Sequence, residues 1–425
     1  MIPKIKQRIE QIHRGEIPEG YKKAKVGIVP REWKESHLSN YLVVSSEKNQ
    51  KLKYTKKDVF SISGELGIVN QIELLGRSYA GASVAPYGIV YPNDIVYTKS
   101  PLKANPYGII KTNKTGKVGL VSTLYAVFHC KNNVSPNFVQ YYFELDQNLN
   151  NYLYPIVNIG AKHDMKISDE NSLRGWVVFP SLSEQKKIAE ILFTQDKLIT
   201  LKEKLLEEKK RQKKYLMQQL ITGKQRLPGF NGKWRKLLFK ECIKEVDNRS
   251  SKNNQYPILS VTKDGIAYQA DHFNKQIASD NNVGYKIIRR NQLAFSILNL
   301  WMGSVDVLHL CDIGIISPAY KVFECIENYL IPAFAKYFLR SYNVVWLYNI
   351  NSETGASVVR KNLNLSALLN EQLTIPSIEE QEAIANILDT ADKEISMLQR
   401  DLDQEKQKKK ALMQLLLTGI VRVNI

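Results

Sequence analysis

The 425-residue sequence lacks the patterns that mark secreted, membrane-spanning or disulfide-bonded proteins. It contains no run of about 18 apolar residues, so we expect no transmembrane helix and no membrane partner. Residues 1–14 are charged throughout and lack the apolar centre of a signal peptide, which predicts a cytoplasmic protein. The four cysteines lie far apart and form no CxxC pair, so free thiols in a reducing compartment are expected.

Motifs for metal, phosphate and cofactor binding are missing as well. The six histidines form neither an HxxxH nor an HxxxxH pattern, and no metal site is predicted. No GxxxxGK[ST] or GxGxxG loop occurs. The segments NPYG at 105–108 and SPAY at 317–320 only approach the [NDS]PP[YF] loop of amino-methyltransferases, and we interpret both as turns or strand starts. The sequence therefore predicts no catalytic residue and no cofactor.

Positive charge is in large excess. Lysine and arginine total 60 against 42 aspartate and glutamate, which gives a net charge of +18 and a pI of about 9.4. A large excess of this sign favours a partner with dense negative charge, of which nucleic acid is the commonest. A basic protein without such a partner remains the alternative at this point.

An internal duplication is the most informative feature of the chain. Segment 180–226 returns as 376–422 without a gap, with 23 of 47 positions identical, whereas chance would give roughly 3 matches. The preceding parts repeat more loosely, as in GLVSTLYAVFHC from Gly119 and GIISPAYKVFEC from Gly314. The repeat predicts an N-terminal helical segment (1–22), a first globular domain (23–179), a first repeated helix (180–226), a second globular domain (227–375) and a second repeated helix (376–425).

The globular parts are predicted to mix helices and strands. Short runs of β-branched and aromatic residues, broken by Gly, Asn and Pro, predict several strands in each. A proline favours the first turn of a helix, which predicts helices over 137–145 and 333–342. The fold class is therefore α+β, with two similar mixed α/β domains separated by two long helices.

Each repeated segment has the apolar spacing of a coiled coil, with steps of four and three residues. An ordinary amphipathic helix facing a core is the alternative, but the stripe runs for about 37 residues, or about 55 Å. Thr222-Gly223 and Thr418-Gly419 are suited to end the helices. The predicted seam contains Ile188, Leu192, Ile199, Leu206 and Leu216 in the first helix, and Ile384, Leu388, Ile395, Leu402 and Leu412 in the second.

Candidate binding residues cluster in the loops that differ between the halves. Lysine and arginine neutralise phosphates, and amide side chains can read base edges. Each such residue alone is more often a solvated surface group, but their clustering favours contact with DNA. The candidates are Lys99, Lys103, Asn105, Tyr107, Lys111 and Lys114 in the first half, and Lys263, His272, Lys286, Arg289, Asn299 and Trp301 in the second.

The repeated motif resembles a known family. PSxxEQxxIAxIL, a long charged helix ending in LMQxLxTG, and then RLPGF before Trp234 resemble the specificity subunit of type I restriction-modification systems. The resemblance spans nearly the whole chain, with both motif copies in order. It implies that 23–179 and 227–375 are target recognition domains, each reading one half of a split DNA site. It also implies that the two helices pack as an antiparallel coiled coil that spaces the domains.

The resemblance further implies a non-catalytic chain with enzymatic partners. These partners are double-stranded DNA, two methyltransferase (M) subunits that use S-adenosylmethionine, and endonuclease/translocase (R) subunits that use ATP. Three alternatives stay open: a recognition subunit whose single partner polypeptide combines methylation and cleavage, a free-standing bipartite DNA-binding protein, and a structural coiled-coil scaffold.

Overall fold

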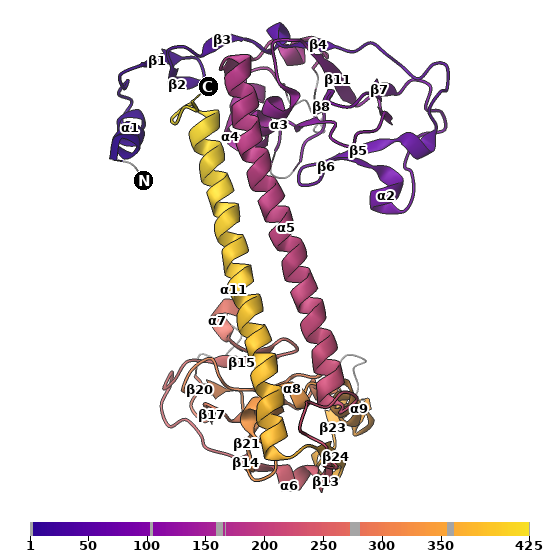
Figure 1. Cartoon of the computed structure of the whole chain (residues 1–425), viewed down its shortest axis with the longest axis vertical. Helices are drawn as coiled ribbons and strands as arrows, with labels where there is room; N and C mark the ends of the chain where they lie inside the picture. Colours follow the sequence, from indigo (N-terminus) through magenta and orange to yellow (C-terminus); the bar gives the residue numbers. More distant parts are fainter. Residues whose placement is uncertain are drawn as a thin grey trace. The chain divides into compact units, whose positions relative to one another are not determined.

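A computed structural model describes residues 3–102, 105–158, 165, 167–272, 281–354 and 361–424 of the chain (Figure 1). The chain divides into two compact units, the first formed by residues 1–202 and 401–425 and the second by residues 203–400. Two 40-residue helices, α5 (Leu182–Ile221) and α11 (Ile378–Leu417), contribute to both units. Each unit therefore joins one globular part to the start of one long helix and the end of the other.

The first unit has short elements before α5. Its helices are α1 (Pro3–His13), α2 (Gln71–Leu75), α3 (Pro136–Glu144) and α4 (Asp146–Leu153). Its strands are β1 (Tyr21–Ala24), β2 (Gly27–Pro30), β3 (Lys34–His37), β4 (Leu42–Val44), β5 (Phe60–Ser63), β6 (Gly67–Asn70), β7 (Gly88–Val90), β8 (Ile95–Thr98), β9 (Ile110–Thr112), β10 (Gly119–Val121), β11 (Tyr125–Cys130) and β12 (Trp176–Phe179).

An antiparallel sheet of order β4-β11-β8-β9 forms the centre of this unit. Its inward side chains, among them Tyr97 and Phe128, are buried in one core with aromatic residues of α3 and β12. Phe138 of α3 lies edge-on to Phe179 of β12, with ring centroids 5.1 Å apart. Large rings bury much apolar area, so this cluster fixes α3 against the sheet.

The second unit repeats this plan. Its helices are α6 (Phe239–Cys242), α7 (Gln269–His272), α8 (Pro332–Phe338), α9 (Tyr342–Ile350) and α10 (Leu365–Leu369). Its strands are β13 (Arg235–Leu238), β14 (Ile243–Val246), β15 (Leu259–Thr262), β16 (Gly265–Tyr268), β17 (Lys286–Arg289), β18 (Leu293–Ser296), β19 (Val305–Val307), β20 (Ile313–Ile316), β21 (Tyr320–Cys325), β22 (Ser352–Thr354), β23 (Lys361–Leu363) and β24 (Gln372–Ile375).

The central sheets and three ribbons of the two units correspond, whereas, among the described residues, β1-β2 and β22-β23 each occur in one unit. The central sheet β14-β21-β18-β19 matches β4-β11-β8-β9, and the ribbons β13-β24, β15-β16 and β17-β20 match β3-β12, β5-β6 and β7-β10. Even isolated bridges recur, since Val59 pairs with Leu120 and Ile258 pairs with Ile315, both in parallel. The α+β class and the duplication predicted from the sequence are confirmed.

Proline sets the start of the first helix that follows each central sheet. Pro136 and Pro332 occupy the first turns of α3 and α8, where the fixed φ of proline suits a helix and its missing N–H is not needed. The prediction for 137–145 is confirmed to within a residue. The prediction for 333–342 was wrong at its end: the chain leaves the helix after Phe338, and Ser341 adopts the extended conformation that starts α9.

Glycine ends both long helices, as predicted. Gly223 and Gly419 have φ values of +68° and +72°, a left-handed conformation that side-chain-bearing residues rarely adopt. Space is also restricted, because a Cβ on Gly223 would lie 3.1 Å from the Trp234 ring. Within the described part of the chain, no helix combines the length and apolarity needed to cross a bilayer.

Candidate nucleic-acid interface

The repeated PSxxEQ motif places a buried glutamate at the start of each long helix. Glu380 of α11 accepts hydrogen bonds from Arg226, with Nε–Oε1 and Nη2–Oε2 distances of 2.6 and 2.7 Å. In the first unit, Glu184 of α5 accepts from Arg422 at 2.5 and 2.8 Å. Two-point arginine–carboxylate bonds are short and directional. They tie the start of one helix to the chain just beyond the end of the other.

The glutamine of the motif is buried beside this pair. Gln381 Oε1 accepts from the Ile331 N–H at 3.1 Å, and its Nε2 donates to the Tyr329 carbonyl at 2.7 Å. Gln185 repeats the first contact, since its Oε1 accepts from the Ser135 N–H at 2.9 Å. Both glutamines thereby hold the segment that enters α3 or α8. Buried polar groups need such partners, which explains why the motif keeps a glutamate and a glutamine together.

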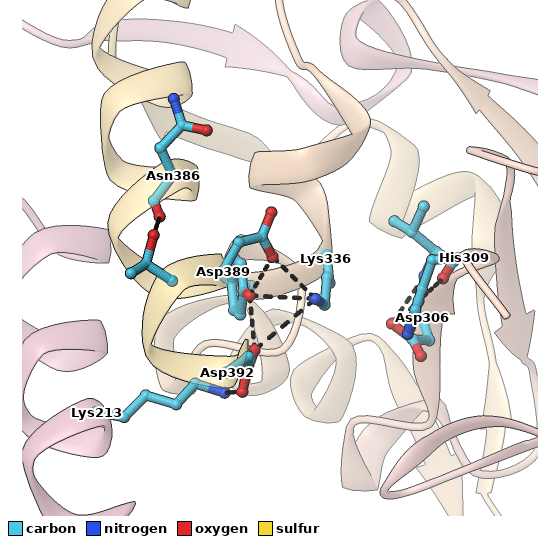
Figure 2. Close-up of polar contacts among 10 residues, drawn as sticks. Lys213, Asp306, His309, Lys336, Asn386, Asp389 and Asp392 are labelled. Carbon is cyan, nitrogen blue, oxygen red and sulfur yellow. Dashed lines mark hydrogen bonds and ion pairs between the residues drawn. The ribbon is translucent and has the colours of Figure 1, made fainter. Parts of the chain in front are cut away.

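A second set of equivalent contacts lies further along the helices. Figure 2 shows Lys213 and Lys336 directed at Asp392 in the second unit, where the Tyr337 hydroxyl also donates to Asp392 at 2.7 Å. In the first unit, Lys409 and the Tyr141 hydroxyl both contact Asp196 at 2.8 Å. These positions differ by 196 residues, the offset of the sequence repeat.

The Asp392 carboxyl has a shifted pKa. Burial alone would raise the pKa of its carboxyl, but hydrogen bonds from Lys213 and Tyr337 outweigh burial and hold the pKa below its ordinary value. The charged form therefore stabilises the second unit.

The predicted seam residues have two kinds of surroundings. At the helix ends they belong to the cores of the globular parts: Ile188 and Leu192 to the first core, with Leu412 at its edge, and Ile384, Leu388 and Leu216 to the second. Between the ends, Ile199, Leu206 and Leu402 are buried and Ile395 is half-buried. Polar contacts interrupt this stretch, as where Lys202 contacts Asp401 at 2.7 Å in the first unit and Lys209 contacts Glu394 at 2.7 Å in the second. Their order along the chain makes the helices antiparallel within each unit.

The candidates of the first half separate into two groups along the β8–β9 hairpin. Three candidates lie in or beside the loop that joins β8 to β9, and each already contacts another residue of the unit. Lys99 pairs with Asp169 at 2.8 Å, Asn105 donates to Asp146 at 3.1 Å, and Tyr107 lies edge-on to Tyr154. Lys103 lies outside the described residues. The remaining two, Lys111 and Lys114, lie toward the other end of the hairpin.

Lys111 is the unusual member of this second group. Its side chain is 7% exposed, burial lowers its pKa, and it makes no hydrogen bond or ion pair with a described residue. It lines a cavity of about 610 Å³ whose wall also contains Lys114, Glu144, Asp196 and Lys409. An unpaired buried ammonium costs stability, so Lys111 is not explained by the packing of the unit.

The second unit has a carboxylate at the same place. In the second unit Asp306 of β19 pairs with Ala294 of β18, and in the first unit Lys111 of β9 pairs with Val96 of β8. Asp306 and Lys111 therefore occupy the same position of matching strands. Its two oxygens accept from the backbone N–H groups of Ile266 at 3.0 Å and of Val307 at 2.9 Å. Asp306 lines a cavity of about 600 Å³. The walls of the two cavities therefore differ in charge at this one matching position.

Comparisons with known proteins agree with this duplicated architecture. Residues 315–405 match the family model of the type I restriction modification DNA specificity domain. A protein of Methanocaldococcus jannaschii that carries the name of a type I restriction enzyme specificity subunit is 22% identical over 445 residues, which cover 95% of this chain and 97% of that protein. The chain is therefore similar to the type I restriction-modification specificity subunits over nearly its whole length.

Solved structures support the fold. A chain from a study titled "Structural basis underlying complex assembly and conformational transition of the type I R-M system" has a TM-score of 0.53 at 15% identity, over 92% of this chain and 99% of that one. The type I S subunit from M. genitalium has a TM-score of 0.50 at 10% identity, over 92% and 96% of the two chains. At such identities the likeness concerns the fold alone.

The candidates in the second half of the chain lie on separate elements. Lys286 of β17 is buried and pairs with Asp247 at 3.2 Å, so its charge is neutralised within the unit. Arg289 at the end of β17 and Lys263 in the β15–β16 turn are exposed, and His272 ends α7. Asn299 and Trp301 lie in the β18–β19 connection, where the Lys361 ammonium is 4.9 Å from the centre of the Trp301 ring.

Sequence reasoning missed a lysine-rich loop in the first unit. Buried Asn49 fixes this loop by donating to the Tyr54 and Val84 carbonyls at 2.8 and 3.3 Å. The only sequence signal was the density of lysine, since five of ten residues are lysine. The loop lysines, all exposed, are Lys48, Lys51, Lys53, Lys56 and Lys57.

Proposed function

We propose that this protein is a specificity subunit, the DNA-reading component of a type I restriction-modification complex, with each unit reading one half of a bipartite site. The observation that carries the proposal is the duplication of a whole unit with altered chemistry at matching positions. Lys111 and Asp306 are the clearest case. A shared framework presents both readers alike, while different donors and acceptors select different bases.

The proposed DNA surface of the first unit is the lysine loop together with Lys114. The exposed loop ammonium groups can neutralise phosphates, whereas Lys114 would have to release its hydrogen bond to Asn137. In the second unit, exposed Lys263 and Arg289 are the proposed phosphate contacts, and Asn299 and Trp301 are the proposed base contacts. Lys99, Asn105 and Lys286 hold their own unit together, and we assign them a supporting role.

The repeated helices are proposed to space the readers and to bind the partners. Each helix has 40 residues, about 60 Å at 1.5 Å per residue, which sets the two readers apart by a distance on the order of 15 base pairs, centre to centre, with an unread gap between the half-sites. Duplicated surfaces bind duplicate partners, so two methyltransferase subunits are expected, with endonuclease subunits joining them. The chain itself contributes no catalytic group in this scheme, and methylation and cleavage belong to these partners.

A domain exchange tests the proposal. Residues 33–179 would be replaced by the matching domain of another specificity subunit, and the methylated sites of the host genome would be mapped. We expect one half-site to change while the other half-site and the gap stay the same. Changes in both half-sites would contradict the assignment of one reader to each unit.

A matched exchange of residues 235–375 provides the control, because it should change the opposite half-site. Insertion of seven residues into both helices at equivalent positions tests the spacer separately. The gap is expected to lengthen with both half-sites intact, and an unchanged gap would remove the helices from the spacing role.

A further inference from the structure

Helix α9 of the second unit exposes an apolar stripe. Tyr342, Trp346 and Ile350 are 82%, 52% and 50% exposed, and a spacing of four residues places them on one face of the helix. The nine residues of α9 include no charged side chain. Exposed large apolar groups that gather on one face mark interaction sites.

A hollow of about 470 Å³ adjoins this stripe. Tyr342 and Trp346 line both, and the wall of the hollow also includes Trp234, Phe338, Leu347, Ile221 at the end of α5 and Thr222 just beyond it. All of these residues belong to the second unit. Stripe and hollow together offer the aromatic and aliphatic surface into which an amphipathic helix can bury its apolar face.

The first unit shows what kind of element stands at such a hollow. Its matching hollow, of about 490 Å³, is lined by Trp33, Leu417 and Thr418, the counterparts of Trp234, Ile221 and Thr222. One wall is the amphipathic helix α1, through Ile9 and Ile12. Among the residues that line the hollow of the second unit, none belongs to a comparable helix.

The C-terminal ends of α11 and α5 also differ in the hydrogen bonds that their carbonyl groups accept. In the first unit, Arg8 of α1 donates to the Ile420 carbonyl at 2.5 Å, and the Tyr21 hydroxyl donates to the Gly419 carbonyl at 2.7 Å. The matching carbonyls of Gly223 and Lys224 receive no hydrogen bond from a described residue. The carbonyl end of a helix attracts positive charge, so the open end of α5 complements a cationic side chain.

We propose that the stripe and hollow of the second unit bind an amphipathic helix of a partner protein. This helix presents aliphatic side chains on one face and an arginine that bonds to the carbonyls at the end of α5. The first unit has Asp146, Asn150 and Tyr154 where the stripe has its apolar residues, so the surface is not duplicated. The partner therefore binds once per chain, and its binding is independent of DNA reading.

A labelled peptide of residues 1–16 of this chain serves as the probe, because it has the chemistry of α1. It would be titrated into the full-length protein and followed by fluorescence anisotropy. We expect saturable binding that weakens at least roughly tenfold when Tyr342, Trp346 and Ile350 are all replaced by serine. The matched control Tyr154→Ser should leave binding unchanged, and an Arg8→Glu peptide should bind roughly tenfold more weakly.

Absence of saturable binding, or equal binding to the triple variant, would overturn the proposal. Hydrogen exchange of the second unit checks that the triple variant is folded, and Trp346→Ser alone serves if it is not. Sedimentation tests whether a second copy of the chain occupies the surface instead. A wild-type dimer that becomes a monomer in the triple variant would assign the surface to that second copy and refute the partner helix. DNA affinity should be the same in wild type and variant, which separates this test from that of DNA reading.

Discussion

Lys111 in the first unit and Asp306 in the second occupy one position of one fold, with opposite charges. The Asp306 carboxylate is held by two backbone N–H groups, whereas the Lys111 ammonium makes no hydrogen bond to a described residue. The helices α3 and α8 also make different ion pairs with the long helices. In the first unit Glu144 of α3 binds Lys409 at 2.7 Å, and in the second Lys336 of α8 binds Asp389 at 3.0 Å.

The difference shows which features the duplication has kept. Strand pairing, the aromatic core and the glutamate–arginine pairs are the same in both units, because they determine whether the unit folds at all. The charge on the cavity wall has changed at Lys111 and Asp306, because strand pairing there does not depend on it.

The largest effect is expected from breaking one glutamate–arginine pair. Arg226→Met leaves the Glu380 carboxylate buried with only the Trp234 Nε1 donor, 3.2 Å away, and should destabilise the second unit by about 3–5 kcal/mol. Arg422→Met should do the same to the first unit, where Trp33 Nε1 is buried without a described partner. Hydrogen exchange of peptides from each unit measures the two destabilisations separately.

Exposed Arg211→Met is the control for both arginine substitutions, since Arg211 pairs only with Glu208 on the surface of α5. Faster exchange in both units from either single substitution would mean that the pairs do not act within one unit.

The next effect concerns DNA and only the first unit. Replacing the five loop lysines by glutamine should reduce the dependence of log affinity on log salt, by about 0.9 for each DNA phosphate that the loop no longer neutralises. Anisotropy titrations of a random duplex at several salt concentrations measure this slope. The same number of changes at exposed lysines of α5 provides the control. An unchanged slope in the loop variant would remove the loop from the DNA surface.

Substitutions of Asp306 and Lys111 are expected to change the stability of their units in opposite directions. Asp306→Asn removes one strong acceptor from two buried N–H groups and should cost about 1–3 kcal/mol. Lys111→Met removes an unpaired buried charge and should stabilise the first unit by about 1 kcal/mol at pH 7. Hydrogen exchange of β19 and of β9 reports the two changes.

The gain from Lys111→Met should depend on pH. Because burial lowers the pKa of Lys111 in the folded unit, the cost of the charge is complete below that pKa. It declines as pH rises through the folded pKa and is gone above the unfolded pKa of about 10.4. A gain that grows with pH would contradict the assignment of Lys111 as a buried, unpaired ammonium.

The smallest expected effect is the acid sensitivity of the second unit. The pKa of Asp392 lies below its ordinary value, so its contribution is complete above the unfolded pKa of about 3.9 and is lost as pH falls through the folded pKa. Partial exposure limits this contribution to about 1 kcal/mol. Asp392→Asn should remove this part of the pH dependence between pH 5 and 2, measured by hydrogen exchange. A profile identical to that of wild type would show that the Lys213 and Tyr337 contacts do not stabilise the charged form.

The sequence predicted what local chemistry and repetition determine. Pro136 located α3, the glycines ended both long helices, and the ungapped offset revealed the two units. The break between α8 and α9 was missed because no proline or glycine marks it. Lys286 and Lys111 were predicted as surface residues because the burial of short strands depends on pairing with segments distant in sequence. The role of Asn49 was hidden for the same reason, since its partner Val84 is 35 residues away.

The two glutamate–arginine pairs show that the repeated segment and the folded unit are different stretches of the chain. One copy of the repeat, 180–226, supplies Glu184 to the first unit and Arg226 to the second. Two mutations within a single copy therefore damage both units, whereas Glu184 and Arg422, which come from different copies, act on one unit only. Selection on one copy is consequently coupled to the other, so the two stretches of gene are expected to change together at these sites long after the domains they join have diverged.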